Sequence, residues 1–229
     1  MRPVLLLQLG EAPDPVRAAH GTYAAWFERT WDGPLTLHDA RAGGRSPDPR
    51  DYAGVVVTGS ARSLVEPEPW MDDAADHVRR AHDLGVPVIG VCFGHQLIGY
   101  AFGGRVRRNP TGWEVGTCPI TLTDAGARDP LFAGLPPTFD ANFTHEDDID
   151  PASLPGVALA TNAATPVQAI AVGETTRGVQ FHPEFDGAIL TSYVGARREL
   201  YGPAAAAARD TPDGVRVMLN FRRHFVDRS

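Results

Sequence analysis

Residues 86–96 read VPVIGVCFGHQ, an apolar run that leads to a cysteine with a glycine two positions away on each side. A continuous apolar run bounded by turn residues is typical of a strand covered on both faces. The residues from His95 to Phe102 favour a helix. The stretch therefore predicts a buried strand that turns sharply into a helix, with Cys92 at the turn.

Two similar apolar runs precede this stretch, at Val4–Leu9 and Gly54–Gly59. Between the second and third runs, Pro69 begins a segment whose apolar residues recur at helical spacing until Gly85. Strand, helix and strand with short connections imply a parallel crossover. The pattern predicts an α/β fold whose ligands bind at the carboxyl ends of the strands.

After Gly104 the apolar runs become shorter and alternate with polar residues, as antiparallel strands do. We expect edge strands or hairpins at 105–108 and 117–123, and short strands at 157–160, 167–172 and 178–182. Residues 150–156 are typical of a loop. The whole chain, 1–229, is expected to form one domain with a mostly parallel, mixed sheet flanked by helices.

The last segment predicts a further helix, because Thr211 can cap it and Pro212 suits its first position. Its buried face is expected to carry Val215, Met218, Leu219 and Phe225. The alanine run at 204–208 also favours a helix.

Composition excludes several function classes. The 28 acidic residues against 21 basic ones give a formal net charge of -7, which argues against nucleic acid as a direct ligand. All 21 basic residues are arginine. A chain without lysine cannot form a pyridoxal-phosphate Schiff base, act as a lysine aldolase or carry a Gly-Lys-[Ser/Thr] phosphate loop. We expect no cofactor.

The cellular location is predicted from two features. The first apolar run is too short for a signal peptide, and the sequence has no stretch of about 18 apolar residues, so we expect a cytoplasmic protein that does not enter a membrane. The two cysteines, Cys92 and Cys118, are then expected to be free thiols in a reducing compartment. A homodimer is the default assembly for a soluble enzyme.

Cys92 lies in a G-x-C-x-G pattern at the predicted turn from strand to helix. A nucleophile elbow needs glycines at these positions because the turn is strained and closely packed. The helix start favours a thiolate, and the amide N–H of Phe93 is placed to stabilise an oxyanion. The alternative is that Cys92 is a small buried apolar residue at a strand end.

A base for this cysteine is offered by His182-Pro183-Glu184, which follows the apolar residues of the strand expected at 178–182. On an extended segment, residues two apart point to the same side, so His182 can face Cys92 while Glu184 orients its second nitrogen. A surface histidine is the alternative for this motif alone.

The sequences GVCFGHQ at 90–96 and QFHPEF at 180–185 together resemble the class I, triad-type glutamine amidotransferase domain, and in particular its stand-alone, GMP-synthase-like members. The resemblance extends to Thr58-Gly59-Ser60, to 109–116 and to Thr144-His145. It implies a flavodoxin-like fold of this family, with Cys92 as nucleophile, His182 as general base and acid, and Glu184 as the residue that orients the histidine.

The same resemblance implies an oxyanion hole formed by the N–H groups of Gly59 and Phe93. Gln96 matches the family residue that holds the amino-acid end of glutamine, helped by the backbone of a loop at Phe143, Thr144 and His145. Gly59 could otherwise be a turn glycine, and Gln96 a solvated helix residue.

Two charged runs are given structural interpretations. The residues at 145–148 lack an H-x-x-x-H or cysteine pair with ligand spacing, so we expect a loop with a solvated acidic face and no metal. The run at 105–108 is expected to be a solvated strand, with a docking edge as the alternative.

The resemblance implies that the cysteine attacks the γ-carboxamide of glutamine to give a glutamyl thioester and ammonia. The ammonia acceptor would be a separate synthetase subunit, or the protein would be a free-standing hydrolase. An alternative substrate is a γ-glutamyl peptide or γ-glutamyl amine, cleaved by the same three residues. A catalytically silent binding protein of the same fold is the third hypothesis.

Overall fold

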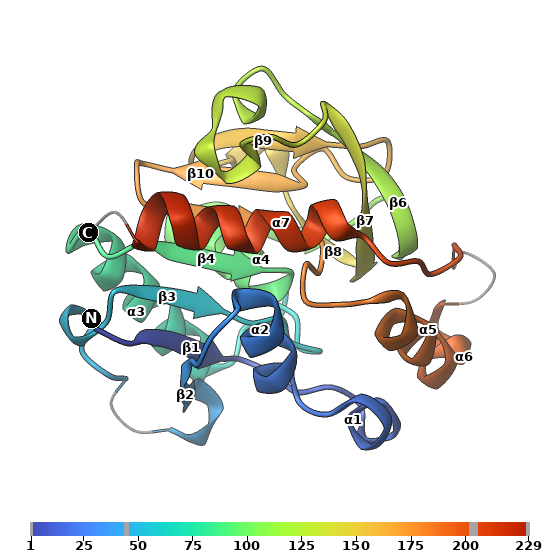
Figure 1. Cartoon of the computed structure of the whole chain (residues 1–229), viewed down its shortest axis with the longest axis horizontal. Helices are drawn as coiled ribbons and strands as arrows, with labels where there is room; N and C mark the ends of the chain where they lie inside the picture. Colours follow the sequence, from blue (N-terminus) through green and yellow to red (C-terminus); the bar gives the residue numbers. More distant parts are fainter. Residues whose placement is uncertain (1, 44–45, 202–205, 228–229) are drawn as a thin grey trace.

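A nine-stranded mixed sheet forms the centre of the computed structural model, which describes residues 2–43, 46–201 and 206–227 (Figure 1). The strand order is β2-β1-β3-β4-β11-β10-β9-β6-β7. The bounds are β1 Val4–Gln8, β2 Thr36–Asp39, β3 Gly54–Val57, β4 Val88–Val91, β6 Glu114–Leu122, β7 Thr138–His145, β9 Val157–Thr161, β10 Ala169–Val172 and β11 Thr176–Val179. A separate antiparallel pair joins β5 Val106–Arg108 to β8 Asp147–Ile149.

The sheet has a parallel and an antiparallel half, and β11 belongs to both. Strands β2, β1, β3, β4 and β11 pair in parallel, whereas β11, β10, β9, β6 and β7 pair antiparallel. This arrangement confirms the predicted mixed sheet. Because β4 and β11 are neighbours, Val91 is paired with Val179, and the ends of these two strands lie together.

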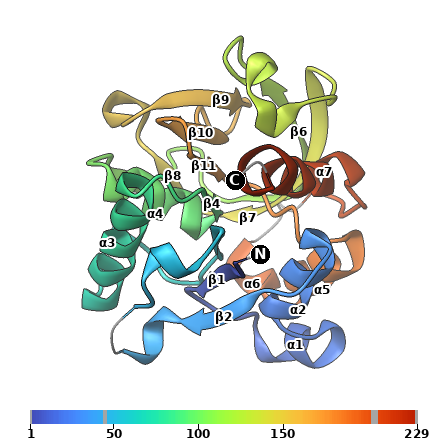
Figure 2. The ribbon, with the colours of Figure 1, turned by 60° about the vertical axis from the view of Figure 1, so that its left-hand side comes forward.

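Helices cover both faces of the sheet (Figure 2). Helices α3 Pro69–Asp83 and α4 Phe93–Ala101 lie on one face, and α1 Asp14–His20, α2 Tyr23–Trp31 and α7 Pro212–Phe221 lie on the other. The remaining helical segments include α5 Gly187–Ala196, α6 Arg198–Tyr201 and the π-helical turn η7 Arg222–Val226. No helix in the described ranges is both long enough and apolar enough to span a membrane.

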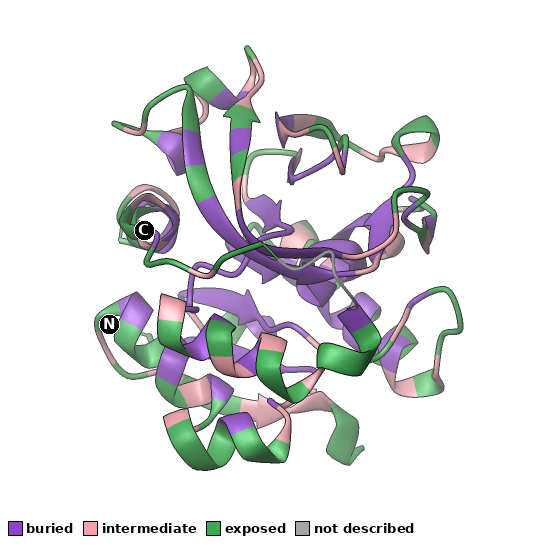
Figure 3. Ribbon diagram, turned by 90° about the vertical axis from the view of Figure 1, so that its right-hand side faces the viewer, coloured by how far each residue is buried: buried purple, intermediate pink, exposed green. Residues whose placement is uncertain are grey.

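Alternate side chains of each central strand point to opposite faces of the sheet, so the core has two parts, one under each layer of helices. Leu5 and Leu7 pack with the α3 and α4 side chains, whereas Leu6 packs with those of α2 and α7. Successive strand residues point to opposite faces, so a strand buried on both sides is apolar throughout. The buried colouring of the central strands follows this pattern (Figure 3). The three apolar runs and the helix from Pro69 are therefore confirmed.

The last helix begins after Thr211 as predicted, but its buried face is different. Met218 is fully buried, whereas Leu219 is 40% exposed and Val217 and Phe221 fill the core instead. Asn220 also lies on the buried face, and its side-chain amide donates to the carbonyl oxygens of Leu131 and Ala133 at 3.0 Å. These bonds satisfy the buried amide, so a polar residue is accommodated there.

The alanine run at 204–208 was expected to be helical. Ala204 and Ala205 lie outside the described residues, and Ala206–Ala208 are not helical. The backbone N–H of Ala206 donates to Val115, and Ala207 accepts from the N–H of Thr117. Pairing with β6 therefore overrides the helix preference of alanine.

Candidate active site

The turn after β4 places Cys92 in a conformation that side chains rarely adopt. Its φ is +54° and its ψ is -106°, and α4 begins at the next residue, Phe93. A Cβ atom on Gly90 would lie 2.3 Å from the carbonyl oxygen of Gly94, and one on Gly94 would lie 2.5 Å from the carbonyl oxygen of Val57. Both glycines are therefore required by close backbone contacts, as predicted for a strained elbow.

His182 and Glu184 form a buried pair just beyond β11. The His182 Nδ1 atom lies 2.8 Å from Glu184 Oε1, and the two residues are 2% and 1% exposed. A carboxylate accepts here, so Nδ1 is the protonated donor. The His182 ring also stacks on Phe185, with 4.1 Å between ring centroids. The predicted pairing of His182 with Glu184 is present.

The backbone that carries this pair is not the extended strand that we expected. Strand β11 ends at Val179, and the N–H of Phe185 donates to the carbonyl of His182 at 3.3 Å, which closes a turn. Pro183 has no N–H and a fixed φ, so it favours a turn over continued strand pairing. The N–H of His182 donates instead to Asn142 of β7 at 2.8 Å.

Gly59 lies beside both Cys92 and the imidazole of His182. A Cβ atom on Gly59 would lie 3.3 Å from Cε1 of His182 and 3.7 Å from Cβ of Cys92. The second nitrogen of the ring, Nε2, is buried and has no hydrogen-bond partner of ordinary geometry in the described part of the chain. The topology therefore brings Gly59, Cys92 and His182 together from three different strand ends.

The electrostatic environment favours the protonated form of His182. Burial lowers the pKa of the ring, but the charges of Glu184 and Cys92 outweigh burial and raise the pKa to about 10. A buried imidazolium between a carboxylate and a sulfur is stabilised by both neighbours. The arrangement can hold a proton next to the sulfur and release it to a reacting group.

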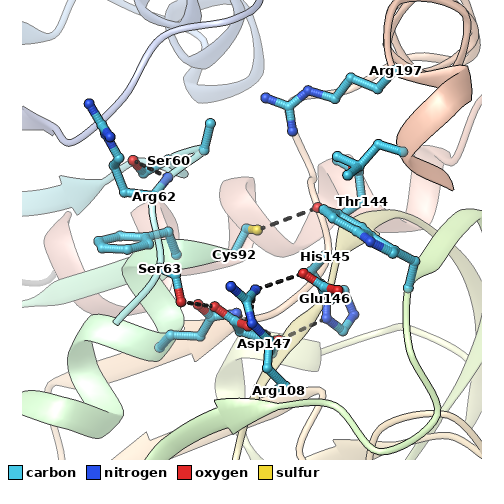
Figure 4. Close-up of a pocket in the computed structure, with 15 residues that line it drawn as sticks. Ser60, Arg62, Ser63, Cys92, Arg108, Thr144, His145, Glu146, Asp147 and Arg197 are labelled. Atoms are coloured by element: carbon cyan, nitrogen blue, oxygen red, sulfur yellow. Dashed lines mark hydrogen bonds and ion pairs between the residues drawn. The ribbon is translucent and has the colours of Figure 1, made fainter. Parts of the chain in front are cut away.

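A cavity of about 320 Å³ opens above Cys92 (Figure 4). This volume lies in the range of small-ligand pockets. Phe93, Gln96, Thr144 and His145 line it with Cys92, and the thiol of Cys92 lies 4.0 Å from the carbonyl oxygen of Thr144. The predicted nucleophile and three of the predicted substrate-binding residues therefore share one cavity.

Gln96 is fixed within the wall of this cavity. Its Nε2 donates to the carbonyl oxygen of Asp147 at 2.8 Å and to Oε1 of Gln180 at 3.1 Å. The side chain is 3% exposed, so the alternative of a solvated helix residue is wrong.

The Phe143–His145 segment differs from the predicted loop because it is the end of strand β7, paired with β6. Phe143 does not line the cavity; its ring is fully buried in the core, edge-on to Phe181 at 6.2 Å. Its alternation in the strand directs the ring into the apolar layer.

A buried polar network behind the cavity was missed by sequence reasoning. His145 Nε2 lies 3.0 Å from Glu114 Oε2, and His145 Nδ1 lies 3.0 Å from the carbonyl oxygen of Asp147. Glu114 also accepts from Thr165 at 3.1 Å and from Gln168 at 2.8 Å. The carbonyl of Asp147 thus meets both His145 and Gln96, so Glu114 indirectly supports the wall that holds Gln96.

The acidic run after His145 is not the solvated face that we expected. Asp147 and Asp148 of this run are buried, at 6% and 0% exposure, as is Asp150 beyond it at 3%, whereas Glu146 is partly exposed. Arginines of the run at 105–108 neutralise them across the β5–β8 pair: Arg108 with Asp147, Arg107 with Asp148 and Arg105 with Asp150. The run at 105–108 is therefore a paired strand that compensates buried carboxylates. Within the described ranges, no group of three or more His, Cys, Asp or Glu side chains could hold a metal ion.

The sequence was compared with protein families and with known proteins, and it matches one family. The family model described as "Glutamine amidotransferase class-I" matches residues 44–191. The chain is 34% identical over 178 residues to the putative glutamine amidotransferase-like protein YfeJ of Salmonella typhimurium, covering 72% of this chain and 70% of that protein. It is 29% identical over 182 residues to gamma-glutamyl peptidase 5 of Arabidopsis thaliana, covering 76% and 72%.

A third relative is much longer. The GMP synthase of Thermomicrobium roseum is 35% identical over 135 residues, which are 57% of this chain but 23% of that protein. Among solved structures, a glutamine amidotransferase of Thermotoga maritima has a TM-score of 0.76 at 16% identity, with 99% of each chain covered. One from Methylobacillus flagellatus has a TM-score of 0.75 at 20% identity, covering 97% of this chain and 95% of that chain. These structures share the fold.

Proposed function

Because the chain belongs to the class I glutamine amidotransferase family, we propose that it hydrolyses the γ-amide bond of glutamine or another γ-glutamyl compound, with Cys92 as the nucleophile. The observation that carries the proposal is the strained elbow at Cys92, which lines a cavity and lies beside the buried His182–Glu184 pair. A reducing compartment such as the cytoplasm would keep this thiol available.

The chemistry proceeds in two halves. The proton of the Cys92 thiol passes to His182 Nε2, and the sulfur attacks the γ-carbonyl carbon, where the charge on the carbonyl oxygen is stabilised by the N–H groups of Gly59 and Phe93. His182 gives this proton to the departing nitrogen, which leaves as ammonia or an amine, and a glutamyl thioester remains. Water then gives a proton to His182 as its oxygen attacks the thioester carbon, and the departing sulfur takes that proton back, which releases glutamate and restores the thiol.

Glu184 orients the ring throughout this cycle. Its contact with Nδ1 fixes the tautomer that presents Nε2 toward the sulfur, as the carboxylate of a triad does. Gln96 contacts the amino-acid end of the substrate, and its side chain is already held in place by hydrogen bonds to Asp147 and Gln180. Thr144 and His145 complete that side of the cavity.

L-Glutamine is the simplest substrate, and γ-glutamyl peptides are the second candidate because one relative is named a gamma-glutamyl peptidase. The relative named GMP synthase supports a further proposal, that ammonia passes to a separate synthetase subunit.

The test is glutamate release from L-glutamine and from a panel of γ-glutamyl peptides and amines. Wild-type protein and Cys118→Ser are expected to turn over at least one of them, whereas Cys92→Ala is expected to lose activity by about a million-fold or to background. Circular dichroism checks that Cys92→Ala remains folded. Activity retained in Cys92→Ala would contradict the mechanism, and binding of these compounds without any turnover would favour a silent binding protein.

A further inference from the structure

Arg197 stands at the side of the cavity and has no part in the chemistry described above. It follows the last residue of α5, and its N–H donates to the carbonyl of Tyr193 at 3.1 Å, which fixes the backbone there. Its guanidinium lies over the Tyr193 ring, 5.6 Å from the centroid. Figure 4 shows this side chain beyond Thr144, across Cys92 from Asp147 and Arg108.

Three arginines line the cavity, and they differ in whether a carboxylate pairs with the guanidinium. Arg108 contacts Glu146 at 2.7 Å and Asp147 at 2.8 Å, and Arg62 contacts Glu68 at 3.4 Å. Arg197 forms no ion pair with a carboxylate in the part of the chain that the structure describes. A guanidinium that lines a cavity without a carboxylate can offer its N–H groups to an anionic ligand.

Two tyrosines that contact Arg197, Tyr193 and Tyr201, do not compensate its charge. Burial raises the pKa of both hydroxyls, so both rings are neutral near pH 7. The hydroxyl of Tyr201 contacts Thr144 at 2.7 Å, which anchors this wall to the cavity.

The position of Arg197 relative to Gln96 indicates which part of a substrate it meets. In the proposed function, the γ-carbonyl lies at Cys92 and the amino-acid end lies toward Gln96, on the Asp147 side. The leaving group departs from the carbonyl away from that end. Arg197 lies on that side of Cys92 (Figure 4). The cavity is also lined by Trp113, whose ring contacts Tyr201, and by the 55%-exposed Leu200, so it combines apolar surface with a positive charge.

We propose that Arg197 binds a carboxylate on the leaving group, so that the preferred substrates are γ-glutamyl amino acids or peptides with a free carboxylate close to the scissile bond. This inference rests on the proposed function. Arg197 would act in specificity, since a carboxylate bound to it adds affinity without entering the covalent steps.

The experiment compares two substrates that differ in one group, γ-glutamyl-alanine and γ-glutamyl-alaninamide. For wild-type protein we expect kcat/KM to favour the carboxylate by roughly ten- to a hundred-fold, as for a charge-assisted hydrogen bond. Arg197→Gln is expected to reduce this ratio to about one, and Arg197→Lys to leave an intermediate ratio, because the charge remains but the bidentate geometry is lost. Arg198→Gln, the exposed neighbour outside the cavity, is the matched control and is expected to keep the wild-type ratio.

An unchanged ratio in Arg197→Gln would overturn the inference and leave the proposed function standing. An equal loss on both substrates would also overturn it, because it would place Arg197 on the α-carboxylate of the γ-glutamyl unit, which both substrates share. Failure of wild-type protein to cleave either compound or glutamine would count against the proposed function itself.

A binding experiment tests the inference about Arg197 even if the protein does not cleave these compounds. Calorimetry measures the affinity of both compounds for the Cys92→Ala protein and for the double variant that also carries Arg197→Gln. A carboxylate preference that disappears with Arg197→Gln supports the inference even where turnover is absent. Equal affinities for the two compounds would overturn it.

Discussion

Gly90 and Gly94 approach each other so closely across the elbow that a Cβ atom on Gly90 would lie 2.3 Å from the carbonyl oxygen of Gly94. That oxygen belongs to the backbone, so it cannot rotate away as a side chain could. We expect Gly90→Ala to lower the free energy of unfolding by about 2–3 kcal/mol and to displace Cys92, reducing activity. Urea denaturation and glutamate release measure the two effects. Gly195→Ala is the control, since a Cβ there meets nothing within 4 Å, and it is expected to be neutral or stabilising. Equal losses in the two variants would contradict the steric argument.

The conformation of Cys92 predicts a conflict between stability and activity. Its φ of +54° is favourable for glycine and strained for other residues. Cys92→Gly and Cys92→Ala both lack the sulfur, but only the glycine variant relieves the strain. We therefore expect Cys92→Gly to be more stable than Cys92→Ala by about 1 kcal/mol, with both inactive. Thermal and urea unfolding measure the difference, and a less stable glycine variant would refute the idea that the elbow is strained.

The pKa of His182 predicts how stability changes with pH. Burial lowers it, but Glu184 and Cys92 raise it to about 10. Because the unfolded ring has a pKa near 6.5, its contribution to stability is complete below about pH 6.5 and is lost as the pH rises toward 10. Glu184→Gln removes a charge that raises this pKa, so its stability should fall less steeply from pH 7 to 10. Urea midpoints across this range test the difference. Parallel curves for the two proteins would show that Glu184 does not hold the proton on His182.

The two cysteines should differ in reactivity. Burial raises the pKa of Cys118, and the charges of Glu114 and Asp140 add to this effect, so its thiolate is disfavoured at neutral pH. Cys92 lines the cavity at the start of α4, where a small reagent can enter. We expect iodoacetamide to modify Cys92 at least about tenfold faster, as followed by peptide mass spectrometry, and to inactivate wild-type and Cys118→Ser at the same rate. Faster labelling of Cys118 would contradict this order.

Sequence patterns were sufficient where a structural feature depends on nearby residues. The glycines at 90 and 94 imply the elbow because their contacts lie within the turn and the adjoining strand. The helix from Pro69 and the apolar strands follow from periodicity alone. The spacing of His182 and Glu184 predicted that they act as a pair, and the structure places them in contact, although the turn that carries them was predicted as an extended strand.

The features that the sequence did not reveal depend on contacts between distant segments. The residues next to Arg107 in the sequence do not indicate that it pairs with Asp148. The charged run was therefore expected to be solvated. Glu114 gathers its partners from positions 145, 162, 165 and 168, which only the folded sheet brings together. Arg197 follows an unremarkable helix, and its relation to the cavity comes from how that helix is placed.

The position of β11 between the two halves of the sheet has a consequence for the timing of synthesis. Cys92 leaves the ribosome roughly ninety residues before His182, a delay of about 5–20 s at ordinary translation rates. Until β11 joins β4, the cysteine has neither its imidazole neighbour nor the wall contributed by the later strands. The contact between the Cys92 and His182 segments can therefore form only after both β4 and β11 have been synthesised.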